Sequence, residues 1–210
     1  MNNIILNKKV IDSDEIFDTI DSEIYEIKDN CKLVINIDNK GINKSIFNLG
    51  NNSSLVINKY YKEKDLEEEI TINLNGINGR VDYNFSTLVY NDQKYIINVN
   101  HNNISTISNV VNHGVVVNDS KLIFEVNSSV EKGNKKSVLN QKSKIIVMSK
   151  NNCVIKPNLF IDEYDVDAVH AATIGRFNDE DIFYLMTKGL DKDSAIELLI
   201  KGFLNGHIGR

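Results

Sequence analysis

Short runs rich in Val, Ile and Leu recur along the first three quarters of the chain, and they constrain its fold more than any other feature. Each run has the length of a β-strand, and β-branched residues favour strands. Clusters of Asn, Gly, Ser and Asp separate the runs, and these residue types favour tight turns. The six runs span residues 32–37, 54–59, 69–74, 95–99, 121–126 and 144–149.

The spacing of these runs predicts a mainly β protein. Counted from Leu33 to Ile145, their first Leu or Ile residues are 22, 15, 26, 26 and 23 residues apart. A strand every twenty-odd residues, with no helix-length segment between, is typical of a β-solenoid. The evenly spaced hairpins of a β-sandwich are the alternative, and the irregular repeat leaves both open. Period-two alternation predicts inward-facing side chains at Leu33, Ile35, Leu55, Ile57, Ile70, Ile72, Leu122, Phe124, Ile145 and Val147.

Asparagine is unusually frequent, with 31 among the 210 residues. It tolerates left-handed backbone and hydrogen-bonds its own turn, so the excess suits a chain with many tight corners. A biased genome composition would produce the same excess, and the sequence leaves both explanations open.

Composition and charge exclude several classes of function. The chain is long enough for one domain with a sizeable core, and its formal net charge of −5 provides no basic field for nucleic acid. No apolar run approaches the roughly 18 residues of a membrane span, and the N-terminus lacks the apolar core of a signal peptide. The two cysteines form no disulfide framework. We therefore expect a soluble, cytoplasmic protein without membrane or nucleic-acid partners.

The first thirty residues differ from the runs that follow. Segment 12–27 mixes acidic residues with isolated apolar ones. It is compatible with a short helix capped by Asp12 or Ser13, with Ile16 on its apolar face. It is equally compatible with a lid over the open end of a solenoid, whose apolar core needs a polar cover. We assign residues 1–30 to an N-terminal cap segment.

The C-terminal segment changes period and predicts two short amphipathic helices, at residues 179–188 and 192–204. Asn178 suits the N-cap of the first helix and Gly189 suits its stop, because these residue types favour the two helix ends. An aspartate just before the second helix suits its N-cap.

A set of linked motifs near the C-terminus resembles the SufB/SufD family, the scaffold proteins of the Suf iron–sulfur cluster assembly system. The motifs are Pro157 before an apolar-acidic strand, aspartates before His170, the run HAATIGR (170–176), the helix DEDIFYLMTKGL (179–190) and a second helix ending in GF (202–203). Residues 101–149 also resemble the family's β-helix pattern, so the similarity covers about half of the chain. It implies a right-handed parallel β-helix core over residues 31–170 and a small C-terminal helical module over residues 171–210.

The resemblance implies that His170 is a metal or cluster ligand, because the SufD branch has a histidine in this HxATxG setting at the interface with its partner. Imidazole is an ordinary iron ligand and is neutral at cellular pH. A histidine that hydrogen-bonds the turn into the helices is the alternative. Acidic residues Asp162, Glu163, Asp165 and Asp167 flank the histidine. Carboxylates can bind iron or orient a ligating imidazole, but more often they form a solvated face.

Cys153 is the second candidate ligand, because thiolates are the usual ligands of iron–sulfur clusters. A small buried hydrophobe in a turn is the alternative. In the SufB branch an essential cysteine lies near the start of the strand that matches residues 141–149. Those positions here are Gln141, Lys142 and Ser143, and Cys153 does not match. This departure favours the SufD side of the family, or a scaffold whose ligands come from elsewhere.

The resemblance also implies partners. The family places the C-terminal helix pair against SufC, an ATP-binding-cassette ATPase, and we expect Phe183, Tyr184, Met186 and Lys188 to bind it. Capping of the solenoid end is the alternative role for the pair. A SufB-like paralogue, or a second copy of this chain, is expected to complete a dimer through β-helix edges. A transient iron–sulfur cluster would assemble there.

Three functions compete on this basis. We expect a non-catalytic scaffold subunit, because the chain shows no P-loop, GxSxG, paired CxxC or helix-opening GxGxxG. The second hypothesis is an adaptor that only positions or activates the ATPase. The third is a β-helix carbohydrate enzyme, which would need clustered charged groups along a groove that the sequence does not indicate.

Overall fold

Two parallel β-sheets, each of seven strands in the described residues, form the body of the protein. The computed structural model describes residues 7–38, 43–62, 66–149 and 152–206. Sheet A contains, in spatial order, β1 (Lys8–Ile11), β3 (Ile24–Ile27), β5 (Lys44–Leu49), β7 (Leu66–Leu74), β9 (Gln93–His101), β11 (Leu122–Val130) and β13 (Val154–Ile161). Sheet B contains β2 (Glu15–Phe17), β4 (Lys32–Asp38), β6 (Ser54–Lys62), β8 (Arg80–Val89), β10 (Ile107–Val116), β12 (Ser137–Val147) and β14 (Val166–Gly175).

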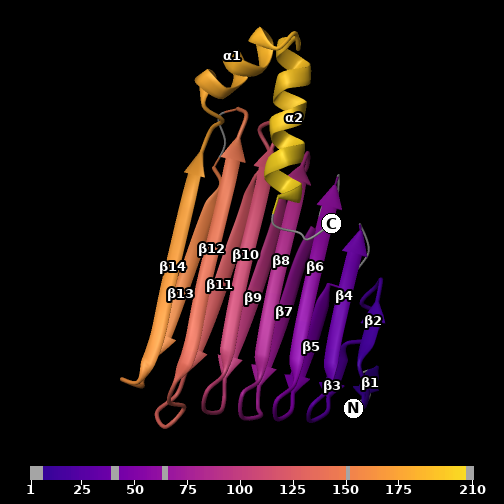
Figure 1. Cartoon of the computed structure of the whole chain (residues 1–210), viewed down its shortest axis with the longest axis vertical. Coiled ribbons are helices and arrows are strands. Elements are labelled where there is room, and N and C mark those ends of the chain that lie inside the picture. Colours follow the sequence, from indigo (N-terminus) through magenta and orange to yellow (C-terminus); the bar gives the residue numbers. More distant parts are fainter. Residues whose placement is uncertain (1–6, 39–42, 63–65, 150–151, 207–210) are drawn as a thin grey trace, which may run out of the picture.

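Consecutive strands alternate between the two sheets, so the chain winds as a continuous coil. In Figure 1 the strands of sheet B run upward in front, those of sheet A run downward behind, and the chain advances from right to left. This arrangement is a right-handed parallel β-helix, and it confirms the predicted fold class. The β-sandwich alternative is wrong, because every strand pair is parallel rather than antiparallel.

The N-terminal segment forms strands where a helix was one of two expectations. Strands β2 and β3 occupy residues 12–27, and their pairing with β4 and β5 outweighs a weak helical pattern. Polar contacts lie at the first coil. The Lys9 ammonium lies 3.8 Å from the centroid of the Phe17 ring and 3.5 Å from an Asp21 carboxylate oxygen. Asp21 also accepts a hydrogen bond of 2.9 Å from the Tyr25 hydroxyl. This segment thus forms strands with polar contacts beside them, and it leaves Ile16 74% exposed.

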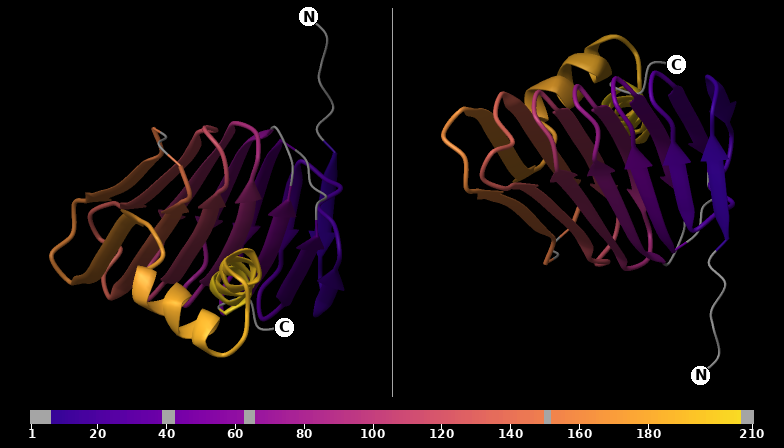
Figure 2. Two further views of the ribbon diagram at one scale, coloured as in Figure 1. Left: turned by 90° about the horizontal axis from the view of Figure 1, so that it is seen from above. Right: turned by 90° about the horizontal axis from the view of Figure 1, so that it is seen from below.

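Two helices follow the solenoid, as predicted: α1 (Asp179–Thr187) and α2 (Lys192–Asn205). Asn178 and Asp191 are their N-caps, and each side chain accepts a backbone N–H hydrogen bond from the first turn. Figure 2 shows both helices on the same side of the solenoid, with α2 against sheet B. Strand β14 continues to Gly175, beyond residue 170, where the β-helix core was expected to end. Within the described ranges, no helix is long and apolar enough to cross a membrane.

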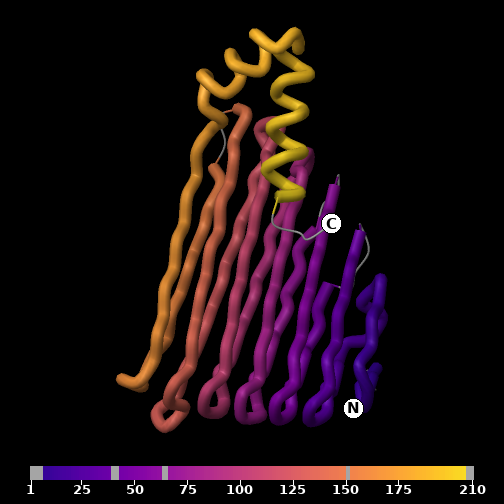
Figure 3. Tube along the Cα trace, in the orientation of Figure 1, coloured from indigo at the N-terminus to yellow at the C-terminus, as the bar shows by residue number. Residues whose placement is uncertain are grey.

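The coils lengthen toward the C-terminus over most of the solenoid. Figure 3 shows the resulting taper, which is narrowest at the N-terminal coil. This lengthening explains part of the irregular spacing of the predicted runs. The rest arises because some successive runs stack within one sheet, as β4 and β6 do, whereas others lie on opposite sheets, as β6 and β7 do. Paired residues of sheet B give successive coil lengths of 22, 26, 27 and 31 residues along the series Leu33, Leu55, Val81, Ser108 and Leu139.

Side chains alternate between the interior and the outer face along the long strands. Of the ten residues predicted to face inward, nine are at most 1% exposed, and Val147 is partly buried against the same core. Aromatic rings fill the middle coils, where the Phe85 ring lies 5.5, 4.5 and 6.0 Å from those of Tyr61, Tyr95 and Phe124. This continuous apolar column stabilises the fold, because a single coil cannot bury its own apolar face.

One ion pair lies inside this apolar core. Lys59 of β6 and Glu68 of β7 are 0% and 2% exposed, and the Lys59 ammonium contacts a Glu68 carboxylate oxygen. Glu68 also accepts a hydrogen bond of 2.8 Å from the Tyr61 hydroxyl. The ammonium lies 4.8 Å from the centroid of the Tyr61 ring and 5.1 Å from that of Phe85. Such partners are required, because removing a charge from water costs several kcal/mol per ion.

Asparagine has two structural roles in the solenoid. At one corner, Asn30, Asn52 and Asn78 have φ values of 61°, 52° and 58°, a left-handed conformation that asparagine tolerates. Their side chains are hydrogen-bonded from coil to coil at 3.3 and 2.9 Å. The predicted link between asparagine and tight corners is therefore confirmed. Asparagine amides also form hydrogen-bonded ladders across the outer faces of both sheets, in the series Asn36, Asn58, Asn84 and the series Asn48, Asn73, Asn100.

Candidate functional site

The two ends of the solenoid differ in how they cover the interior. The inward-facing side chains Ile11 and Tyr25 of the N-terminal coil are buried, whereas β13 and β14 at the other end leave inward-facing apolar side chains in contact with solvent. Ile161 and Ile174 stand in register with the buried residues Val130 and Ile145, and they are 38% and 45% exposed. In the described residues, β13 and β14 are also the last strands of their sheets, so each presents an unpaired edge. Unpaired edges with apolar side chains are typical of a surface that another protein covers.

His170 lies at the centre of this open end. It stands in register with Gln141 of β12, on the row of β14 that faces the interior. The same row is buried at Gln141 and at Val110 of β10, whereas His170 is exposed because no later coil of the described chain covers it. The imidazole is thus accessible to a metal ion or a partner beyond the end of the solenoid.

Cys153 lies at the same end but away from His170. It directly precedes β13 and packs against the main core, and burial raises the pKa of its thiol, which disfavours the reactive thiolate. The Cys153 thiol lies beside the backbone of Leu122. The Leu122 side chain faces Gly114 across the interior, and Gly114 stands in the same register position as Ile174 of β14. At about 3.3 Å per residue, four residues separate that level from His170 by roughly 13 Å. One chain therefore does not bring the two predicted ligands together.

Of the flanking carboxylates, Glu163 accepts backbone hydrogen bonds in the turn before β14. The backbone N–H of Gly133 donates to Glu163 at 2.8 Å, and this hydrogen bond lowers the pKa of the Glu163 carboxyl. Asp167 is three residues from His170 on the same strand, so alternation places it on the opposite face. Across the described residues, no group of three or more His, Cys, Asp and Glu side chains could hold a metal ion. A metal site at this end would therefore need ligands beyond those that the described residues bring together.

The helix α1 presents an apolar and aromatic face to solvent. Phe183, Tyr184 and Met186 are 68%, 59% and 41% exposed, and α1 contains no buried residue. The Lys188 ammonium lies 5.1 Å from the centroid of the Tyr184 ring. The four residues predicted to bind a partner are thus exposed together, and α1 reaches the rest of the molecule mainly through α2.

Residues 24–203 match the family described as "SUF system FeS cluster assembly, SufBD core domain". The chain belongs to the SufBD family. It is 38% identical over 96 residues to the iron-sulfur cluster assembly protein SufD of Bacillus subtilis (strain 168), an alignment that covers 45% of this chain and 22% of the relative.

Shorter alignments link this SufBD chain to two further relatives. It is 44% identical over 48 residues to SufD of Escherichia coli (strain K12), which covers 23% of this chain and 11% of that protein. It is 45% identical over 40 residues to an iron-sulfur cluster assembly SufBD family protein of Archaeoglobus fulgidus, which covers 19% and 11%. The aligned regions span less than a quarter of the length of these relatives.

In this SufBD core, a row of side chains on sheet B fastens α2. The Ser86 hydroxyl donates to the Leu204 carbonyl at 2.6 Å, and His113 Nδ1 lies 3.1 Å from the Phe203 carbonyl oxygen. The rings of His113 and Phe203 stack with centroids 4.5 Å apart. Both carbonyls belong to the last turn of α2, where they need donors from outside the helix. No local sequence pattern indicates this contact, because it links residues 90 positions apart.

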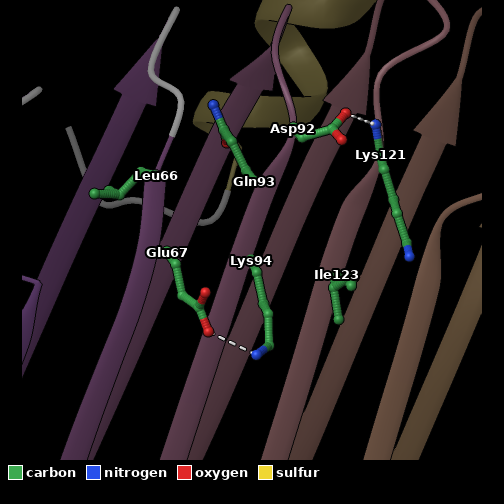
Figure 4. A pocket seen from close by; sticks show the side chains of 7 residues that line it. All are labelled: Leu66, Glu67, Asp92, Gln93, Lys94, Lys121 and Ile123. Atoms are coloured by element: carbon green, nitrogen blue, oxygen red, sulfur yellow. Dashed lines mark hydrogen bonds and ion pairs between the residues drawn. The ribbon is translucent and has the colours of Figure 1, made fainter.

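Among the surface grooves of the SufBD core, two lie beside α2 and on sheet A. The first, of about 390 Å³, runs between α2 and strands β6 and β8 and has a mainly apolar lining. The second, shown in Figure 4, is a groove of about 230 Å³ on sheet A. There Glu67 and Lys94 form an ion pair of 2.6 Å, and Asp92 accepts a hydrogen bond of 2.8 Å from the backbone of Lys121. These polar groups of the second groove are already ion-paired or hydrogen-bonded to one another. We assign no ligand to either groove.

Proposed function

We propose that this chain is a scaffold subunit in iron–sulfur cluster assembly. Its helical module docks an ATP-binding-cassette ATPase of the SufC type. Its open end pairs with a SufB-like paralogue or with a second copy of the chain. The cluster is the transient cargo of that interface, and His170 contributes a ligand to it. Driven by ATP, the docked ATPase moves the paired subunits, and this chain acts as the lever.

The asymmetry of the solenoid carries this proposal. One end buries its inward-facing side chains Ile11 and Tyr25, whereas the end that presents His170 leaves the inward-facing Ile174 45% exposed. A single imidazole is an incomplete metal site, and a paired subunit would complete it while covering the apolar surface. Membership of the SufBD family supports the same role.

Loss of the helical module should abolish binding of the ATPase. Truncation after Phe177 should leave a β-helix that no longer binds a SufC-type ATPase, although it exposes apolar residues beneath α2. Phe183→Ala should weaken binding by about 2 kcal/mol or more, because an exposed aromatic ring is a typical central anchor. Isothermal titration calorimetry with the purified ATPase measures both effects.

Phe160→Ala is the matched control for the aromatic anchor. Phe160 is 61% exposed, close to the 68% of Phe183, but it belongs to β13 rather than to the helices. Its loss should leave the affinity for the ATPase unchanged. Equal affinities for all three variants and the wild type would contradict the docking role of α1 and α2.

Loss of the His170 imidazole should reduce cluster formation in the assembled complex. His170→Ala should leave folding and ATPase binding as in the wild type, because the side chain is exposed and lies outside the helical module. Anaerobic reconstitution, followed by absorption spectroscopy of the cluster, measures the effect. Cys153→Ser should have a smaller effect, since that thiol is partly buried and remote from His170. Reconstitution of His170→Ala to the wild-type level would favour the adaptor.

An adaptor without cluster ligation is the second candidate function. The observation that favours it is the lack, within the described residues, of any group of three or more metal-binding side chains. Anaerobic titration of the complex with ferrous iron separates the two functions. A scaffold subunit predicts that iron retention depends on His170, whereas an adaptor predicts iron retention independent of this chain's histidines and cysteines.

A further inference from the structure

Gln141 lies directly behind His170, and two contacts hold its amide in place. Its Nε2 donates to Ser128 Oγ at 2.8 Å and to the backbone carbonyl oxygen of Asn158 at 3.2 Å. A carbonyl oxygen can only accept, so the atom beside Asn158 is the amide nitrogen and the other is Oε1. Gln141 is 1% exposed, and these two contacts therefore fix the direction of its amide.

The Oε1 atom of Gln141 has no hydrogen-bond partner within the described ranges. A buried polar atom without a partner lowers stability, so native proteins seldom leave one without a hydrogen bond. The Gln141 amide reaches from β12 across the interior to the backbone of β13, which belongs to the terminal coil. His170 belongs to the same coil. It is the next residue along the inward row, one strand spacing of about 4.8 Å from Gln141.

We propose that Gln141 is a positioning residue for His170. When the exposed imidazole turns about its side-chain bonds toward the interior, one ring N–H donates to Gln141 Oε1. The hydrogen bond selects one tautomer and leaves the lone pair of the other ring nitrogen directed out of the open end. Ligating histidines usually donate their second ring N–H to such an acceptor, which fixes the ring and tunes metal affinity. The inference rests on the ligand role proposed for His170.

The tautomer of His170 in the full chain tests this inference. Nitrogen NMR of the imidazole reports which ring nitrogen carries the proton and how fast that proton exchanges with water. In the wild type we expect one tautomer with a slowly exchanging ring N–H. Gln141→Met keeps the side-chain length but removes the oxygen, so the slow exchange should be lost. An imidazole with the signals of an unrestrained histidine in the wild type overturns the proposal, whether or not the variant folds.

Asn112→Leu is the matched control. Asn112 is also fully buried and has an amide oxygen without a partner in the described chain, but it lies on β10, one strand farther from the open end. Its replacement should lower stability as Gln141→Met does and leave the His170 tautomer unchanged. A tautomer change of equal size in both variants would show general loosening and overturn the proposal. The NMR readout needs neither the ATPase nor a cluster. Its result for Gln141 is therefore independent of the result of His170→Ala for cluster formation.

Discussion

Replacing Glu68 with leucine is expected to lower the free energy of unfolding by about 3–5 kcal/mol, because Lys59 then remains in the core without its carboxylate. Lys59→Met should be similarly costly, since it leaves a buried carboxylate without its ammonium. The double variant, which replaces the ion pair by apolar side chains of similar size, should match the wild type or exceed its stability. Urea unfolding followed by circular dichroism measures all three.

The exposed ion pair of Glu67 and Lys94 provides the control for this cycle. Its N–O distance is 2.6 Å, but the two side chains are 66% and 37% exposed (Figure 4). Glu67→Leu should therefore change stability by less than about 1 kcal/mol, because solvent screens exposed pairs. If Glu68→Leu lowers the free energy of unfolding no more than Glu67→Leu does, the stability of the core does not depend on the buried pair.

Gly76→Ala is expected to be the second severe substitution. A Cβ atom on Gly76 would overlap the carbonyl group of Gly50 and the backbone nitrogen of Asn51 in the preceding coil. Backbone atoms in a stacked corner cannot move aside as a flexible side chain can. We therefore expect the free energy of unfolding to fall by about 1–3 kcal/mol or more. Thermal unfolding of the purified variant measures it.

Gly175→Ala is the matched substitution in open space. No atom outside its chain neighbours lies within 4 Å of the Cβ position at Gly175, near the end of β14. Alanine there should be neutral or slightly stabilising, because it restricts the unfolded chain. Equal melting temperatures for the two variants would show that the corner at Gly76 adapts to a side chain.

The six predicted runs fall on β4, β6, β7, β9, β11 and β12, whereas β8 was passed over. Strand β8 alternates Val81, Tyr83 and Phe85 with polar residues, so it is buried on one face without forming a run. The helices were predicted closely because their signals are local. Asn178 caps α1, and Gly189 stops it with a φ of 98°. Long-range packing, as between His113 and Phe203, leaves no such local signal.

The buried ion pair and the candidate site were both predictable only in part. Alternation places Lys59 on the inward face with Ile57, but its burial depends on Glu68 from the opposite sheet, and no sequence spacing specifies that partner. The sequence also placed His170 and Cys153 at one end of the solenoid without their positions along the strands. The distance between His170 and Cys153 depends on the register of their strands. That register follows from the lengths of all the preceding coils.

The widening of the coils gives the molecule two ends of unequal circumference, and this bears on how copies can associate. Growth into a filament requires the leading end of one copy to match the trailing end of the next, coil for coil. A narrow first coil that carries Lys9 and Asp21 does not match the wide final coil. Two wide ends match each other, and their union covers both sets of open edges. We therefore expect association through the wide ends to give a pair rather than a filament, because it covers the edges of β13 and β14 in both copies.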